Sequence, residues 1–162
     1  MVTLKKLTTQ DLDYFWIWGS DPRVTQSLFW DAYESKDDAS RFLASIVEPH
    51  PFFKAICYNG KPVGAVTLDQ GKGRGNVRAE LGYVIAKDYW GQGLTTKAVL
   101  LAIEDGFKEL EIVRIESFVD PDNIGSIRVL EKAGLQKEGY LKKYLIPRGE
   151  IRDRIVYGIT RK

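Results

Sequence analysis

The middle of the chain holds the feature that most constrains its fold, a strand–helix–strand passage. Residues Val77–Ala86 form a strand-like run, residues 94–110 carry an apolar stripe at helical spacing, and Ile112–Val119 are again rich in apolar side chains. Such a passage is typical of a mixed α/β layer. Ligands of these units bind at the carboxyl ends of the strands. We therefore expect the functional site in the turn between Ala86 and Thr96.

The amino-terminal segment is expected to contain one strand and two helices. Residues Val2–Leu7 predict the strand, and Thr8 or Thr9 can cap the helix that follows. Asp21-Pro22 interrupts that helix. Ser35 then begins a second helix, because apolar residues follow it at helical spacing.

The remaining elements lie on either side of the central passage. Asn59-Gly60 joins the strand-like runs Phe52–Tyr58 and Lys61–Leu68, which is a strong hairpin signal. The elements expected downstream are a helix over Asn123–Ala133 and strands over Leu135–Ile146 and Arg152–Thr160. The expected order over residues 1–162 is β-α-α-β-β-β-α-β-α-β-β, which we interpret as one α/β domain.

Composition excludes several classes of function. The 162 residues amount to about one domain at about 150 residues each. Lys and Arg number 24 against 22 Asp and Glu, and the resulting charge of +2 is too small for a dedicated nucleic-acid-binding protein. A single cysteine, Cys57, and a single histidine, His50, exclude an intrachain disulfide and argue against a metal site. Neither a secretory signal nor a membrane-spanning apolar stretch is present, so we expect a cytoplasmic protein.

The turn before the long helix predicts an anion site. Gly91-Gln92-Gly93 leads directly into the helix, whose first N–H groups are unpaired and lie at its positive dipole end. Glycines let a phosphate or pyrophosphate approach the backbone, although a plain tight turn would use the same residues. The dinucleotide fingerprint needs a third glycine where Thr96 stands, and the Walker pattern is absent. The turn therefore favours a phosphate-bearing cofactor other than a nicotinamide dinucleotide or ATP.

Four segments carry a family resemblance. Tyr89-Trp-Gly-Gln-Gly-Leu-Thr-Thr-Lys-Ala98 resembles motif A of the GNAT superfamily of acetyl-CoA-dependent N-acetyltransferases, and the run Asn123–Gly139 resembles its motif B. Trp18–Thr25 and Ala79–Tyr83 are similar to the branch of ribosomal-protein N-terminal acetyltransferases. The similarity spans nearly the whole chain in the right order.

The resemblance implies a fold and a cofactor. The expected fold is a central, mostly antiparallel sheet of about six or seven strands with helices on both faces. Acetyl-CoA is the implied acetyl donor, with its pantetheine arm beside a strand in which Gly82 permits a local bulge. The oxyanion donor is expected near Val84 or Ile85. The cofactor-binding residues implied in this way are Tyr83, Val84, Ile85, Gly91, Gln92, Gly93, Leu94, Thr95, Thr96 and Asn123.

Two positions depart from the superfamily pattern. Thr95 stands where motif A has glycine or alanine, and its hydroxyl can either bind phosphate or crowd the turn. Many members use a tyrosine seven residues after the motif B asparagine as general acid, but this chain has Leu130 there. Another group must replace that acid, or the reaction proceeds without it.

Acetyl transfer also needs a base and a donor to the leaving thiolate. Glu80 is the first candidate base, directly or through water, with a plain surface carboxylate as the alternative; Asp120 and Glu34 are weaker candidates. By analogy with the branch, Ser126 can donate a hydrogen bond to the thiolate, and Asn123 can cap the helix as well as contact the cofactor. The aromatic residues Phe29, Trp30 and Tyr33 can line an acceptor groove or fill the core.

The sequence favours one class of acetyl acceptor but leaves alternatives. An α-amine has a pKa of about 7.7–8.0 and a lysine one of about 10.4, so an α-amine needs less help to become neutral. A protein or peptide N-terminus is therefore the favoured acceptor, acetylated by a monomer or homodimer that binds neither nucleic acid nor membrane. The alternatives are a small amine, such as a polyamine, amino sugar or antibiotic, and a non-catalytic acyl-CoA-binding module.

Overall fold

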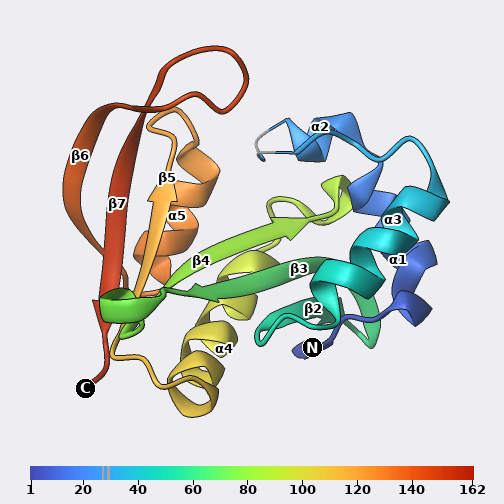
Figure 1. Cartoon of the computed structure of the whole chain (residues 1–162), viewed down its shortest axis with the longest axis horizontal. Coiled ribbons are helices and arrows are strands. Elements are labelled where there is room, and N and C mark those ends of the chain that lie inside the picture. The colour runs from blue at the N-terminus through green and yellow to red at the C-terminus, as the bar shows by residue number, and fades with distance from the viewer. Residues whose placement is uncertain (27, 29) are drawn as a thin grey trace.

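The computed structural model describes residues 1–26, 28 and 30–162 and contains one seven-stranded sheet (Figure 1). The strands are β1 (Val2–Lys6), β2 (Phe53–Tyr58), β3 (Lys61–Gln70), β4 (Arg78–Ile85), β5 (Arg114–Val119), β6 (Gln136–Leu145) and β7 (Arg152–Thr160). They lie in the order β1-β2-β3-β4-β5-β7-β6. Only the central pair β4–β5 is parallel. The expected mixed α/β fold with a mostly antiparallel sheet is confirmed.

Helices cover both faces of this sheet (Figure 1). The α-helices are α1 (Leu12–Gly19), α2 (Pro22–Thr25), α3 (Lys36–Phe42), α4 (Leu94–Glu109) and α5 (Ile124–Lys132). A π-helical turn continues α3 over Leu43–Val47, and short 3-10 turns lie at Thr9–Asp11, Gly73–Gly75 and Lys87–Tyr89. Helices α4 and α5 share one hydrophobic core, whereas α1 and α3 belong to the other.

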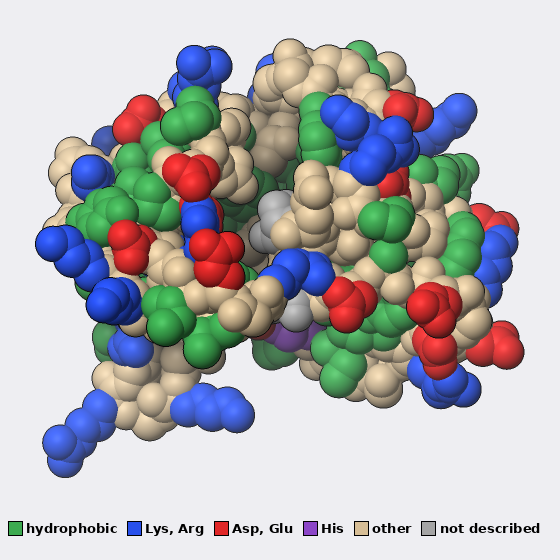
Figure 2. Space-filling view, turned by 90° about the horizontal axis from the view of Figure 1, so that it is seen from above, with side chains coloured by type: hydrophobic (Ala, Val, Ile, Leu, Met, Phe, Trp, Pro, Cys, Tyr) green, Lys and Arg blue, Asp and Glu red, His purple; other side chains and the backbone are tan. Residues whose placement is uncertain are grey.

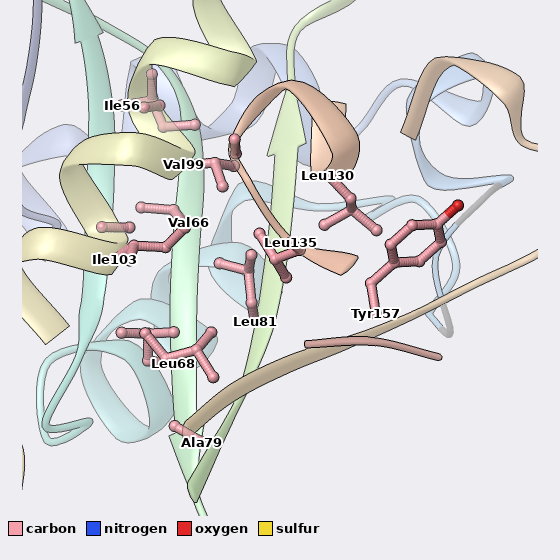
Figure 3. Close-up of a cluster of buried hydrophobic side chains, with 14 of the residues drawn as sticks. Ile56, Val66, Leu68, Ala79, Leu81, Val99, Ile103, Leu130, Leu135 and Tyr157 are labelled. Carbon is pink, nitrogen blue, oxygen red and sulfur yellow. The ribbon is translucent and has the colours of Figure 1, made fainter. Parts of the chain in front are cut away.

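The two cores follow from the alternation of side chains along the strands. Successive residues of a strand point to opposite faces of the sheet. Accordingly, Ile56 of β2 faces α4, while its neighbours Ala55 and Cys57 face α1 and α3. Figure 3 shows the core beneath α4 and α5, where Val99 and Leu130 converge on the sheet.

Several local expectations are confirmed. Asn59 and Gly60 have φ values of 49° and 82°, the positive angles that a two-residue hairpin turn requires. The Thr8 side chain accepts a hydrogen bond from the backbone of Gln10, and a capping box joins Thr8 to Asp11.

The interruption of the first helix at Asp21-Pro22 is confirmed, since α1 ends at Gly19. Pro22 also begins a further helix, α2, because the Asp21 side chain caps it and proline suits the first helical position. The bulge allowed at Gly82 is absent, since β3 and β4 pair residue by residue throughout their register. The irregularity lies instead between β2 and β3, at Ile56 and Cys57.

Strands β4 and β5 pair only at their beginnings. Arg78–Glu80 lie opposite Arg114–Glu116, and beyond these residues the two strands diverge (Figure 1). The divergence divides the sheet into one half with β1–β4 and another with β5–β7. The wedge between them opens toward the carboxyl end of β4, where the glycine turn begins.

Candidate active site at the divergence of β4 and β5

The two glycines of the turn are required by backbone conformation. Gly91 and Gly93 both have φ of +74°, and a Cβ built on either would meet no atom within 4 Å. Residues with a side chain rarely adopt this left-handed conformation. The turn therefore keeps an open surface beside a backbone that only glycine adopts without strain.

Polar contacts of neighbouring side chains fix this turn to the end of β4. The Trp90 indole Nε1 donates to the backbone oxygen of Ile85 at 2.9 Å, and the Lys87 ammonium lies 4.1 Å from the centroid of the Trp90 ring. Gln92 Nε2 donates to the backbone oxygen of Asp88 at 3.0 Å. The Gln92 side chain thus forms its hydrogen bond within the turn, and the backbone of the turn is left for a ligand.

The first turn of α4 fits a pyrophosphate. Gly93 is the N-cap and offers no side chain, so within the described part of the chain no side chain caps this helix. Its first N–H groups need an outside acceptor, and the helix dipole favours an anion there. The Leu94 side chain is buried, so Leu94 can contribute only its backbone, whereas Thr95 and Thr96 are half-buried. The expected cofactor residues of this turn are therefore brought together.

Ser117 marks the point where β4 and β5 separate. This buried residue follows the last paired position of β5, and its hydroxyl donates to the backbone oxygen of Leu81 at 3.0 Å. The side chain replaces the next backbone hydrogen bond between the strands. Sequence reasoning did not single out Ser117; its only signal is one polar residue at an inward position of an apolar strand.

The backbone groups of Tyr83, Val84 and Ile85, the three cofactor contacts predicted on β4, do not all point to the same side of the strand. Ala86 N–H donates to Val63 of β3 at 2.8 Å. Residues of an antiparallel pair alternate between hydrogen-bonded and non-bonded positions, so Val84 also uses its backbone toward β3. Tyr83 and Ile85 direct theirs toward the wedge. Of the two residues near which the oxyanion donor is expected, it is therefore Ile85 that directs its backbone N–H toward the wedge.

Tyr83 and Ser126 meet across the wedge. The Tyr83 hydroxyl donates to the backbone oxygen of Ser126 at 3.3 Å, and burial raises the pKa of Tyr83 to about 12. Asn123 caps α5, with its Oδ1 accepting the Ser126 N–H at 3.1 Å. Leu130 is fully buried in the core. The Tyr83 phenol, which sequence reasoning did not consider, thus links β4 to the backbone of Ser126 at the start of α5.

Glu80 lies on the opposite face, at the closed end of the wedge. Its register neighbours are Asp69 of β3 and Glu116 of β5. Partial desolvation, followed by the charges of Asp69 and Glu116, raises the pKa of Glu80 above its ordinary value. The neighbours have partners: His50 Nε2 lies 2.6 Å from Asp69, and Arg114 lies 2.9 Å from Glu116. Among the described residues, Glu80 forms no ion pair.

The weaker candidate bases are less suitable. Asp120 is 2.8 Å from Arg152 and 3.2 Å from Arg154, and its hydrogen bond to Arg152 holds its pKa below the ordinary value. Glu34 is exposed in the connection between α2 and α3. Glu80 therefore stays the leading candidate.

The predicted aromatic cluster of Phe29, Trp30 and Tyr33 does not have one common role in the structure. Tyr33 packs against Phe15 and Phe42 on the α1–α3 face, with ring centroids 5.7 Å apart in both cases, and thus belongs to the core. Trp30 contacts Tyr33 at 5.3 Å. Phe29 lies outside the described residues.

Comparison with known proteins identifies the family. The family model described as "Acetyltransferase (GNAT) domain" matches residues 1–136, so the chain belongs to the GNAT acetyltransferases. It is accordingly an N-acetyltransferase that uses acetyl-CoA. No group of three or more potential ligands for a metal occurs among the described residues. In the described ranges, no helix has the length and apolar character needed to cross a membrane.

Three similar proteins carry different names. An uncharacterized N-acetyltransferase p20 of Bacillus licheniformis is 29% identical over 99% of this chain and 93% of its own length. Spermidine N(1)-acetyltransferase of Escherichia coli K12 is 28% identical over 95% of this chain and 83% of its own. The structure of Mycobacterium smegmatis RimJ in complex with CoA-disulfide has a TM-score of 0.84 at 25% identity, over 98% of this chain and 81% of that one.

Proposed function

We propose that this enzyme acetylates the α-amine at the N-terminus of a protein or peptide, as the ribosomal-protein branch does. The observation that carries the proposal is Glu80, a carboxyl without an ion-pair partner in the described structure and with a raised pKa. A single carboxylate of this kind suits an α-amine, whose pKa of about 7.7–8.0 leaves a good fraction neutral. The likeness to RimJ supports the same acceptor.

We assign each step of the reaction to residues of this chain. When bound, acetyl-CoA supplies the acetyl group as a thioester. Glu80 accepts the proton of the attacking amine, directly or through water. The Ile85 N–H faces the wedge and stabilises the oxygen on which negative charge develops. Ser126 donates its hydroxyl proton to the departing sulfur. The Tyr83 phenol, which bonds to the Ser126 backbone oxygen and whose raised pKa keeps it protonated, is a second possible donor.

A polyamine is the second candidate acceptor. The spermidine N(1)-acetyltransferase of Escherichia coli is similar along most of both chains. In this chain, the carboxylates of Asp69, Glu80 and Glu116 occupy neighbouring positions of three strands. Asp69 faces His50 and Glu116 pairs with Arg114, so Glu80 is the carboxylate that would attract a cationic chain.

An acceptor panel tests the proposal. Purified enzyme with acetyl-CoA would be given a peptide amide with a free α-amine, the same sequence with a blocked α-amine and one internal lysine, and spermidine. Mass spectrometry would locate the acetyl group. We expect the free α-amine to give the highest kcat/KM. A higher value for spermidine or for the lysine peptide would contradict the proposal, as would acetylation of none of the three.

A further inference from the structure

A glycine stands in the middle of β4 without a conformational reason. Gly82 has no positive φ, and β4 pairs with β3 there without a bulge. A Cβ built on Gly82 would meet one atom within 4 Å besides its chain neighbours, the Thr67 Oγ1 at 2.9 Å. The Thr67 hydroxyl and the β4 backbone thus face each other across a position that only glycine leaves unfilled.

The Thr67 hydroxyl lies on the same face of the sheet as Glu80. Thr67 is the register partner of Gly82, which follows Glu80 on this face because side chains alternate along a strand. Thr67 is half-buried, and in the part of the chain that the structure describes its hydroxyl forms no hydrogen bond. Its partner on β2 is Phe53, whose ring packs against Phe42 and offers no polar group. The hydroxyl is therefore left to bond a ligand or water beside Gly82.

The length of β4 separates the candidate base from the expected oxyanion donor. Ile85 follows Glu80 by five residues of the strand. A strand advances about 3.4 Å per residue, so about 17 Å separates the two Cα atoms. A glutamate side chain is much shorter, so the proton of an amine that attacks near Ile85 cannot reach Glu80 in one step. Gly82 and Thr67 lie between these two ends.

The amine has room to approach this part of the sheet. Figure 2 shows that the molecule is hollowed between the two halves of the sheet, with charged side chains around the hollow. We take this as the direction from which the acceptor enters. An amine that enters there reaches the diverging part of β4, which begins after Glu80 and includes Gly82.

We infer that Thr67 is a positioning residue that holds a water molecule over Gly82, between the attacking amine and Glu80. The amine proton passes to this water as the bond from nitrogen to the acetyl carbon forms, and the water passes one of its own protons to the Glu80 carboxylate. The Thr67 hydroxyl keeps its proton and fixes the water by a hydrogen bond. The inference rests on the proposed function, because it takes Glu80 as the base.

Removal of the hydroxyl tests this inference. Thr67→Val keeps a β-branched side chain that suits a strand and removes no hydrogen bond found in the described structure, so Tm should not fall. We expect kcat to fall about tenfold and the KM for acetyl-CoA to stay within about twofold. Thr67→Ser keeps the hydroxyl and should retain most of the wild-type kcat. An unchanged kcat in Thr67→Val, or an equal loss in Thr67→Ser, would overturn the inference.

A double-mutant cycle separates this role from a structural one. Glu80→Gln removes the base, so a water held for Glu80 then has no group to which it can pass a proton. Adding Thr67→Val to Glu80→Gln should therefore lower kcat by less than about twofold more, whereas independent effects would multiply. Multiplied effects would contradict the inference. An unchanged kcat in Glu80→Gln would remove the base and the inference with it.

The choice of acceptor keeps this test separate from the proposed function. The cycle is measured with the amine that the enzyme acetylates fastest, whichever class it belongs to. A preference for spermidine would therefore refute the proposed acceptor, while the cycle would still decide the role of Thr67.

Filling the position beside the hydroxyl is a second test. The methyl group of Gly82→Ala meets the Thr67 Oγ1 and should exclude the water, so kcat should fall at least about tenfold. Gly139→Ala on β6 is the matched control, because its Cβ would lie at an ordinary 3.5 Å from Val156. Thr3→Val on the edge strand β1 is the control for loss of a strand hydroxyl. The wild-type rate in Gly82→Ala, or the same loss in either control, would reject the role of Thr67.

Discussion

The glycine turn and the acceptor face are built in different ways. At the turn, the proposed binding groups belong to the backbone, at the left-handed Gly91 and Gly93 and the uncapped start of α4. On the face of the sheet that carries Glu80, which we call the acceptor face, the proposed catalytic group is a side chain of β4. A backbone site depends on a short sequence, whereas a side-chain site depends on how distant segments are brought together.

This difference corresponds to the two substrates of the reaction, the cofactor that the family shares and the acceptor. Acetyl-CoA is common to GNAT enzymes, and we expect the local turn to bind its pyrophosphate. The acceptor is expected to meet side chains, such as Glu80, whose surroundings come from several strands. Substitutions at the turn should therefore change cofactor affinity, and substitutions on the acceptor face should change turnover and acceptor choice.

The largest effect is expected on the acceptor face. Glu80→Gln should lower kcat/KM for the amine about 100-fold or more, since a general base contributes about 100- to 10,000-fold. The Kd for acetyl-CoA should stay within about twofold by calorimetry. A tenfold weaker cofactor affinity would mean that the two regions are not separable in this way.

The dependence of activity on pH tests the role of Glu80 on the acceptor face. Activity should fall as pH decreases through the raised pKa of Glu80, because protonation removes the base. The Asp69 charge contributes to that rise, so Asp69→Asn should move the acid limb to lower pH while the maximal rate is retained. The raised pKa also means that ionised Glu80 opposes folding at neutral pH, so Glu80→Gln should not lower Tm there. An unmoved acid limb in Asp69→Asn would exclude Glu80 as its source.

The turn should give the next largest effect. Gly93→Val forces a branched side chain into φ of +74°, at a cost of about 1–2 kcal/mol or more, and should weaken acetyl-CoA binding at least about tenfold. Gly73→Val is the matched control, because Gly73 also has positive φ and open space but lies in the loop between β3 and β4. Equal cofactor affinity in both variants would reject the turn as the pyrophosphate site.

The sequence predicted the turn better than the acceptor face for a physical reason. Gly91, Gly93 and the start of α4 are close in the chain, so local patterns such as helix starts and turn glycines predict them. The Ser117 hydroxyl on Leu81 joins residues 36 positions apart, and the Thr67 hydroxyl beside Gly82 comes from another strand. The backbone direction of Val84 depends on the β3 register, which the sequence does not specify.

A smaller effect is expected at the thiolate. Ser126→Ala removes one hydrogen bond, worth about 1 kcal/mol, so kcat should fall about fivefold with little change in cofactor affinity. The loss is limited because the Tyr83 phenol lies beside the Ser126 backbone. Ser45→Ala, which removes a hydroxyl bonded to Arg41 on the exposed surface, serves as control and should leave kcat unchanged. An unaltered rate in Ser126→Ala would remove this serine from the mechanism.

The smallest effect separates helix capping from cofactor contact at Asn123. Loss of its cap should cost about 1 kcal/mol, or about 2–4 °C in Tm for a domain of this size. Ser35→Ala, which removes the side-chain cap of α3, should give a comparable loss of Tm without changing the Kd for acetyl-CoA. If Asn123 also contacts the cofactor, Asn123→Ala should weaken acetyl-CoA binding a further few-fold. Equal Kd values in the two variants would leave Asn123 as a cap alone, and the backbone of the turn would then account for cofactor binding at this end of the wedge.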